Sequence, residues 1–327
     1  MKKIFSLILT ILLCSSMLVG CAPVNTSIAY TVYPIGYILS RLTDGFLTLT
    51  SIQNDSIIQR ATIKDNYTEI LNDSAVLFHI GQMEPYFSVY STEVSETSCS
   101  KVDLSSMNAV YKFQRYTPTI VDDKVTYTEG PYYDDSSFDD IDVDTLDLYL
   151  WMDPIVMLSM SKDICNWLDT QYPEKKQIFD EKLKDLETDL INLDAQYQSL
   201  SSSILNNNKK IRFVTMTASF GNWQKTYGFE VYPVILSKYG ALPTESQLEV
   251  IKNRIIEDGV KYIVYEPNMT DDMITLFDEL SEELGLTRVE MSNLSSLTEE
   301  ENNSGKDYLS IMYENLQMLE TMVEDRE

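Results

Sequence analysis

Short apolar runs alternate with helical patterns in the first part of the chain. Residues 28–32, 47–52 and 75–80 are apolar runs of strand length, and apolar side chains recur at helical spacing over residues 37–43 and 67–71. Strands that alternate with helices favour a parallel sheet covered by helices. This part of the sequence therefore predicts one α/β lobe.

The same alternation returns after residue 210. Strand-like runs and helical patterns follow one another at 211–216, 221–227, 229–232, 248–257, 261–265, 272–283, 287–291 and 308–323. The order matches that of the first part, although the two parts are not sequence repeats. We therefore expect an α/β fold with two lobes, each with a mainly parallel sheet flanked by helices.

One long amphipathic pattern separates the two lobes. Between Phe179 and Leu200 the apolar side chains recur at spacings of 4, 3, 4, 3, 4 and 3 residues, which gives one sustained apolar stripe. Upstream, Asp153 and Pro154 predict the start of a separate helix that runs to about residue 169. No partner with a matching coiled-coil pattern is evident. The stretch from Pro173 to Leu200 therefore predicts a single rigid helix that lies across both lobes.

The first twenty-one residues have the pattern of an export signal with a lipid attachment site. Two lysines precede an apolar run from Ile4 to Leu13, which is too short to span a bilayer but fits a signal-peptide core. Leu18-Val19-Gly20-Cys21 matches the lipobox pattern, in which the thiol receives diacylglycerol. We expect residues 1–20 to be removed and acyl chains on Cys21 to anchor the protein outside the cell. An ordinary signal peptide with a chance cysteine is the alternative.

The remaining chain divides into three parts by these patterns: an N-terminal lobe over 21–171, a linking helix over 172–205 and a C-terminal lobe over 206–327. Within the first lobe, residues 100–147 carry few helix or strand signals, and we expect a long, mobile, acidic insertion there. Its aspartates could collect divalent cations loosely through oxygen, although a solvated acidic loop is the simpler interpretation. They are Asp134, Asp135, Asp139, Asp140, Asp142, Asp144 and Asp147.

Charge and cysteine content narrow the class of protein. The formal charge is −26, and loss of Lys2 and Lys3 with the signal makes it −28. Such a chain repels nucleic acid and mildly favours cationic ligands.

Cys99 and Cys165 remain in an oxidising compartment, where a disulfide between them is a candidate. Phosphate-binding loops, dinucleotide fingerprints and nucleophile elbows are absent from the sequence, so we expect no enzyme, although hydrolysis by a pair of carboxylates stays open.

The order of short motifs resembles that of a known family. The first motif is Tyr33-Pro34-Ile35, which also predicts a turn. The others are the element with Gly81 and Glu84, residues 149–154, 173–200 and 214–220, Tyr227-Gly228, and residues 263–267 and 308–316. Over residues 27–320 this order is similar to that of the zinc/manganese-type solute-binding lipoproteins of ABC importers, some of which are called adhesins. The resemblance implies a monomer with a metal ion in the cleft between two lobes, which serves an ABC permease and its ATPase and catalyses no reaction.

The sequence departs from this family at the metal ligands. The resemblance places the four ligand positions at Gln59, Tyr149, Thr217 and Ser292, which is next to Asn293. The family supplies mostly histidine plus one carboxylate there, and hydroxyls and amides bind Zn²⁺ weakly by comparison. If zinc or manganese binds, we expect an oxygen-rich, weaker site. The alternative is a degenerate surface lipoprotein or adhesin on the same scaffold that no longer binds metal.

Three further residues are secondary candidates for the cleft. His79 is the only histidine, and it lies near the C-terminal end of an expected parallel strand, where α/β sheets place their ligands. Glu84 and Glu266 also follow strand ends. A hydrogen-bonded histidine and carboxylates that cap helices or meet water are the competing interpretations.

Overall fold

The computed structural model describes residues 25–54, 56–121, 124–143 and 145–326, so the predicted signal sequence, Cys21 and Asp144 lie outside the described residues. The N-terminal lobe is built on a parallel four-stranded sheet of order β2-β1-β3-β4. Its strands are β1 (Ser27–Tyr30), β2 (Thr48–Ser51), β3 (Val76–His79) and β4 (Ser100–Asp103), and its helices are α2 (Tyr33–Thr43), α3 (Tyr67–Asn72) and α4 (Phe87–Glu96). All four residues of β3 are buried, as expected for the centre of a sheet covered on both faces.

The C-terminal lobe repeats this design with a parallel sheet of order β11-β10-β8-β9. Its strands are β8 (Arg212–Thr217), β9 (Glu230–Ile235), β10 (Tyr262–Tyr265) and β11 (Thr287–Glu290), and its helices are α7 (Asn222–Tyr227), α8 (Glu245–Glu257), α9 (Asp271–Leu284), α10 (Glu299–Asn303) and α11 (Tyr308–Thr321). The last residues add a short antiparallel pair, β7 (Lys209–Lys210) with β12 (Glu324–Asp325). The prediction of two α/β lobes with parallel sheets is confirmed.

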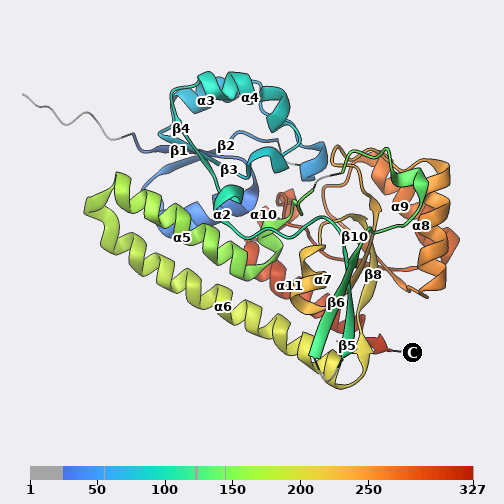
Figure 1. Ribbon diagram of the computed structural model, residues 1–327. Helices are drawn as coiled ribbons and strands as arrows, with labels where there is room; N and C mark the ends of the chain where they lie inside the picture. The colour runs from blue at the N-terminus through green and yellow to red at the C-terminus, as the bar shows by residue number, and fades with distance from the viewer. Residues whose placement is uncertain (1–24, 55, 122–123, 144, 327) are drawn as a thin grey trace, which may run out of the picture.

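A single long helix, α6 (Lys176–Asn206), runs along both lobes (Figure 1). Its 31 residues span about 46 Å at the usual helical rise. The predicted apolar stripe is its buried face, with Phe179, Leu186, Leu190, Leu193 and Tyr197 buried in the main core. The predicted rigid linking helix is therefore present.

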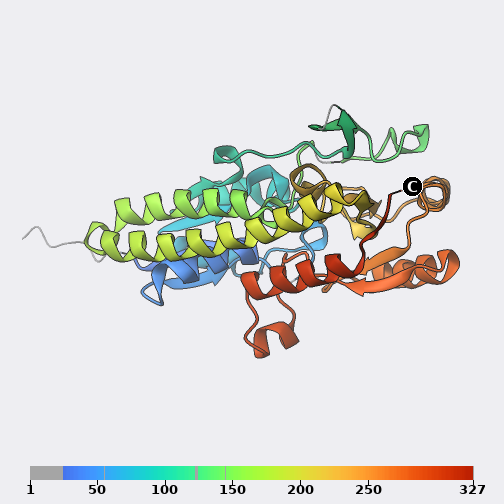
Figure 2. The same ribbon diagram turned by 90° about the horizontal axis from the view of Figure 1, so that it is seen from below.

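A second helix, α5 (Pro154–Gln171), packs along the first part of α6, and the two form a hairpin through the short turn η7 (Pro173–Lys175) (Figure 2). Asp153 caps α5 as the sequence predicts, because its Oδ1 accepts hydrogen bonds from the amides of Ile155 (2.8 Å) and Val156 (3.3 Å). The sequence of α5 carries no coiled-coil repeat that would mark it as the partner of α6. Ordinary ridge-into-groove packing needs no such repeat.

Residues 100–147 contain more regular structure than the sequence analysis expected. Besides β4, they form an antiparallel hairpin of β5 (Arg115–Val121) and β6 (Lys124–Gly130). The expectation of few strands was wrong. Apolar residues alternate with polar ones at Tyr116, Pro118 and Ile120, and Tyr116 and Pro118 are buried, but a proline inside the run counts against a strand in the sequence. The expected turn at Tyr33-Pro34 was also wrong. Pro34 lies in the first turn of α2, where its missing amide hydrogen costs nothing.

The segment after β4 packs against the C-terminal lobe, although the chain order assigned it to the N-terminal lobe. Tyr132 and Tyr133 are buried in the second core cluster, and the Tyr133 hydroxyl donates to the carbonyl of Pro233 (2.9 Å). Arg115 pairs with Asp258 at 3.2 Å.

Within the described part of the chain, no helix is both long and apolar enough to cross a membrane.

Candidate functional site

A buried polar cluster lies around the carboxylate of Glu266, at the C-terminal ends of β8 and β10. Glu266 Oε1 accepts a hydrogen bond from the amide of Thr217 (3.0 Å). Its Oε2 accepts from Asn293 Nδ2 (2.8 Å), from Thr217 Oγ1 (3.2 Å) and, at short range, from Ser219 Oγ. Glu266 is fully buried, so these four donors replace its hydration shell.

The N-terminal lobe and the segment before α5 complete this cluster. The Tyr149 hydroxyl donates to Gln59 Oε1 (2.7 Å) and lies 3.3 Å from Thr217 Oγ1. Gln59 comes from the short helix η2 (Ile58–Arg60) and Tyr149 precedes η6 (Leu150–Met152). The structure therefore brings together three of the four positions that the sequence analysis named.

Large side chains fix the segment that carries Tyr149. Asn222 Nδ2 donates to the Tyr149 carbonyl (2.7 Å), and Trp223 Nε1 donates to the carbonyl of Met152 (2.8 Å). Trp151 Nε1 in turn donates to the carbonyl of Asn293 (2.8 Å), which ties this segment to the loop after β11. Because each of these groups is buried and paired, the positions of Tyr149 and Asn293 are set by the surrounding core.

The η2 segment that carries Gln59 is also bound to the C-terminal lobe. Arg60 Nε donates to the carbonyl of Gly240 (3.0 Å), and Arg60 Nη2 pairs with Asp272 at 3.0 Å. These contacts close the two lobes on one another beside the cluster.

Ser292, the fourth position, faces away from the cluster. Its amide and carbonyl both pair with the Asn315 side chain (2.9 and 2.8 Å), and its hydroxyl accepts from the amide of Leu294 (3.2 Å). It lines a different cavity of about 390 Å³. Asn293 is the residue of this loop that reaches Glu266, because neighbouring side chains of an extended segment point to opposite sides. The structure therefore places Asn293, and not Ser292, in the cluster with Glu266.

Ser219 is a member of the cluster that sequence analysis missed. Its hydroxyl contacts both Thr217 Oγ1 and Glu266 Oε2. It follows Thr217 by two residues just beyond the end of β8, and that spacing could have identified it.

Burial governs the electrostatics of the cluster. It raises the pKa of Glu266, while the hydrogen bonds from Ser219, Asn293 and Thr217 oppose that rise. Burial also raises the pKa of Tyr149, with a further contribution from the nearby Glu266 carboxylate. Tyr149 therefore acts as a hydroxyl and not as a phenolate at neutral pH.

His79 lies in the N-terminal lobe and outside this cluster. Its Nδ1 accepts the amide hydrogen of Gly81 (2.9 Å), and its ring stacks on Phe87 with centroids 4.5 Å apart. Burial lowers the pKa of His79, against the opposing charge of Asp103, so the imidazole is neutral. Gly81 has φ +66°, and a Cβ there would lie 2.3 Å from Asp103 Oδ2. These contacts give His79 a role in holding the turn after β3.

Glu84 is a second buried carboxylate, separate from Glu266. The Tyr86 hydroxyl lies within donating distance of both Glu84 Oε1 (3.3 Å) and Gln53 Oε1 (2.9 Å). Burial raises the pKa of Glu84 to about 8. The carboxyl group is therefore mostly protonated at neutral pH, unless a cation comes close to it.

The aspartate side chains of the acidic insertion differ in burial. Asp134, Asp135, Asp139, Asp140 and Asp142 are exposed, and Asp142 pairs with Lys238 (2.9 Å). Asp147 is buried and accepts the amide hydrogen of Tyr149 through Oδ1 (2.9 Å). Asp147 thus helps to position the Glu266 cluster, while the exposed aspartates form a solvated surface.

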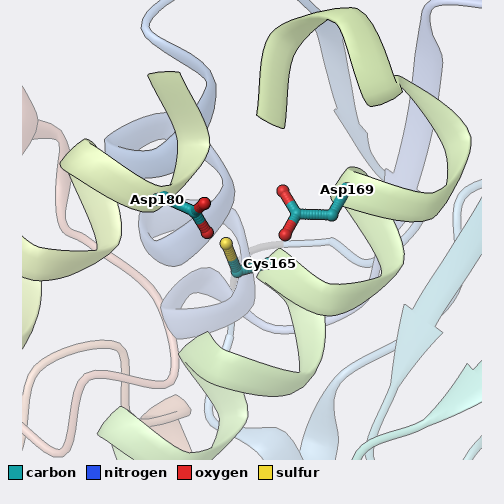
Figure 3. Close-up of side chains that lie close together, drawn as sticks. All are labelled: Cys165, Asp169 and Asp180. Carbon is teal, nitrogen blue, oxygen red and sulfur yellow. The ribbon is translucent and has the colours of Figure 1, made fainter. Parts of the chain in front are cut away.

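A third group of ligand-type side chains lies at the tip of the α5–α6 hairpin (Figure 3). One ligand atom each from Cys165, Asp169 and Asp180 lie within 4.8 Å of one another. The Lys176 ammonium contacts Asp169 and lies 3.2 Å from Asp180, so it offsets part of their negative charge. Cys165 is a free thiol here, and Cys99 is a free thiol in the core of the N-terminal lobe. The candidate disulfide between them is therefore absent from the structure.

The donor set of the Glu266 cluster decides which ions suit it. Its described side chains offer one carboxylate, three hydroxyls and two amides, and no imidazole or thiolate. Carboxylate, carbonyl and water oxygens suit Mn²⁺, Mg²⁺ and Ca²⁺, whereas Zn²⁺ prefers nitrogen and sulfur. A cation that binds Glu266 must also displace hydrogen bonds that this carboxylate already accepts.

Comparison with known proteins places the chain in a family. A family model described as zinc-uptake complex component A, periplasmic, matches residues 28–322. The zinc-binding lipoprotein AdcA of Streptococcus pneumoniae is 28% identical over 174 residues, which cover 53% of this chain and 33% of that protein. The high-affinity zinc uptake system protein ZnuA of Bacillus subtilis is 26% identical over 174 residues, which cover 53% of this chain and 52% of that protein. The matches thus span about a third to a half of these relatives.

Solved structures agree with the family match. The periplasmic zinc-binding protein TroA from Treponema pallidum has a TM-score of 0.69 at 15% identity, over 91% of this chain and 99% of that one. The AdcAII protein of Streptococcus pneumoniae has a TM-score of 0.70 at 16% identity, over 92% and 100%. At these identities the likeness shows the fold. With the family model matched over nearly the whole described chain, the protein belongs to the family of periplasmic zinc-uptake component A proteins.

Proposed function

We propose that this protein is an extracytoplasmic solute-binding receptor of an ABC importer, which passes a divalent metal ion to a permease and its ATPase. The family membership supports this role, as do the printed functions of relatives that bind or take up zinc. Two sheets that face each other across one rigid helix suit a receptor, because α/β sheets bind ligands at the C-terminal ends of their strands.

The ion would bind at the Glu266 cluster, together with Gln59, Tyr149, Thr217 and Asn293. The observation that carries this assignment is that segments from both lobes converge on one fully buried carboxylate. An ion held there would stabilise the closed arrangement of the lobes, which is the form a permease would recognise. Because the donors are oxygens, manganese fits this site better than zinc.

The remaining features of the receptor are proposed from the sequence. Residues 1–20 would direct export, and acyl chains on Cys21 would hold a monomer at the outer face of the cell membrane. The lobes would comprise 21–171 and 206–327, joined by 172–205. The strongly negative charge of the chain would keep the body of the protein away from anionic lipid.

A second function is favoured by one specific observation. Glu266 already accepts four hydrogen bonds, so the cluster is satisfied by protein groups alone. A surface lipoprotein or adhesin that has lost its metal could use the same cluster to lock its lobes together.

Metal content distinguishes the two functions. The purified protein would be loaded with Mn²⁺ or Zn²⁺ and desalted, and the bound metal measured by mass spectrometry and thermal shift. We expect about one Mn²⁺ per chain, and Glu266→Gln should abolish it because the only carboxylate of the cluster is lost. Glu279→Gln, an exposed change on α9, is the matched control. Absence of bound metal, or equal binding by Glu266→Gln, would favour the lobe-locking function.

A further inference from the structure

A cavity of about 600 Å³ lies between the lobes, separate from the residues of the Glu266 cluster. On the N-terminal side it is lined by Thr31, Ser51 and Gln53, which end or follow β1 and β2. On the other side it is lined by Asn268 and Ser295, which follow β10 and β11, and by Glu299 of α10. The C-terminal ends of both sheets thus face one hollow, whose volume lies in the range of small-molecule sites.

One buried hydroxyl on the wall from the C-terminal lobe lacks a partner among the described residues. Ser295 is 1% exposed, and its Oγ makes no hydrogen bond within the described part of the protein. On the opposite wall, Thr31 is 1% exposed, and its hydroxyl lies beside the Glu84 carboxyl and the Tyr86 hydroxyl. A buried polar atom without a partner destabilises the folded protein. A ligand that bonds to Ser295 would remove that destabilisation.

The charge of the lining selects the class of ligand. Glu299 is the only charged residue among those that line the cavity in the described chain, and lysine, arginine and histidine are absent from the lining. Tyr30 and Tyr33 also contribute to the wall, and aromatic rings attract cations. An anion would meet no countercharge here, whereas a cation would meet Glu299 and two tyrosine rings.

We propose that this cavity binds a small organic ammonium compound. An ammonium group supplies up to three hydrogen-bond donors, which match the acceptor atoms of Thr31 and Ser295 and the carboxylate of Glu299. The amides of Gln53 and Asn268 would pair with polar groups elsewhere on the ligand. This ligand is distinct from the metal ion, and the cavity can take it whether or not the Glu266 cluster binds metal.

The two sites share one loop. The amide of Ser295 donates to Asn293 Oδ1 (3.0 Å), and Asn293 Nδ2 donates to Glu266. An amine bound to Ser295 would therefore be connected to Glu266 through the side chain of Asn293. For this reason each site is tested with its own variant, Ser295→Ala for the cavity and Glu266→Gln for the metal cluster.

Isothermal titration of the purified protein with matched probes tests the proposal. Putrescine, 1,4-butanediol and succinate have the same four-carbon length and differ in charge, while ethanolamine and glucosamine add smaller and larger ammonium probes. We expect at least one ammonium probe to bind, putrescine to bind roughly tenfold or more tightly than 1,4-butanediol, and succinate not to bind. Failure of all three ammonium probes, or equal binding of putrescine and butanediol, would overturn the proposal.

Variants locate the binding site. Ser295→Ala should weaken binding of the ammonium probe roughly tenfold, and Glu299→Gln roughly two- to fivefold because Glu299 is exposed. Glu279→Gln should leave it unchanged. Thermal unfolding and Mn²⁺ loading of Ser295→Ala would show that the fold and the Glu266 cluster are intact. The proposal is refuted if Ser295→Ala and Glu299→Gln both bind the ammonium probe as tightly as the parent. It is also refuted if Glu266→Gln abolishes binding of the probe and Mn²⁺ competes with the probe, because both results would place the amine at the metal cluster.

Discussion

Replacing Glu84 by glutamine should stabilise the protein at alkaline pH and remove part of its pH dependence. Burial raises the pKa of Glu84 from 4.5 to about 8 in the folded protein. Between these values the unfolded chain has released the proton while the folded chain still holds it. The free energy of unfolding therefore falls as the pH rises from about 4.5 to about 8.

The size of this effect follows from the shift. Each pKa unit corresponds to about 1.4 kcal/mol, so the full cost is about 5 kcal/mol once the pH exceeds 8. Glu84→Gln keeps an acceptor for the Tyr86 hydroxyl and remains neutral at every pH. At pH 5 the variant should exceed the parent by no more than about 1 kcal/mol, and at pH 8 it should be more stable by several kcal/mol.

Urea unfolding followed by tryptophan fluorescence at pH 5, 6.5 and 8 measures this difference. The pKa of Glu266 is also raised, but Glu266 is present in both proteins, so the difference between them isolates Glu84. Glu279→Gln, which changes an exposed carboxylate on α9, is the control and should show no such trend. A stability difference between the parent and Glu84→Gln that is the same at pH 5 and pH 8 would refute the reasoning.

The remaining predictions concern the metal cluster, the hairpin tip and the long helix. Asn293→Asp adds a carboxylate beside Glu266, so it should raise the Mn²⁺ affinity measured by calorimetry roughly tenfold. Without metal it should lower the melting temperature, because the two carboxylates repel each other; an unchanged Mn²⁺ affinity would contradict this prediction. Burial raises the pKa of the Cys165 thiol to about 12, so little reactive thiolate is present in the native protein at pH 7.5. In a Cys99→Ser variant, peptide mass spectrometry should show that iodoacetamide labels Cys165 in urea but hardly at all in the native protein. Leu190→Ala on the buried face of α6 should cost about 2–5 kcal/mol in urea unfolding, whereas Ile191→Ala on the exposed face should cost far less; equal costs would argue against the packing described here.

The regular elements were predictable because their patterns match their burial. The stripe from Phe179 to Leu200 is the buried face of α6, and the apolar run before Thr217 is a strand with every residue buried. The hairpin of β5 and β6 was missed because Pro118 lies inside the first alternating run, and proline is rare within strands other than edge strands. The pairing of α5 with α6 was missed because helix contact is a property of tertiary packing and leaves no repeat in the sequence.

The candidate site was predictable in part. The motif order led to Gln59, Tyr149 and Thr217, and the fold places the Tyr149 hydroxyl within hydrogen-bonding distance of both other side chains. It could not separate Ser292 from Asn293, because a shift of one residue in an extended segment reverses the direction of the side chain. Glu266 stood among several carboxylates after strand ends, and only the structure shows that it collects four donors while His79 and Glu84 occupy other environments.

The central claim is that a divalent cation binds between the lobes at Glu266. The most direct measurement is anomalous X-ray scattering at the manganese edge from crystals of the Mn²⁺-loaded protein. The account predicts one anomalous peak within coordination distance of a Glu266 carboxylate oxygen, with Tyr149, Thr217 or Asn293 beside it. A peak at Cys165, Asp169 and Asp180, a peak in the acidic insertion, or no peak at all would contradict it.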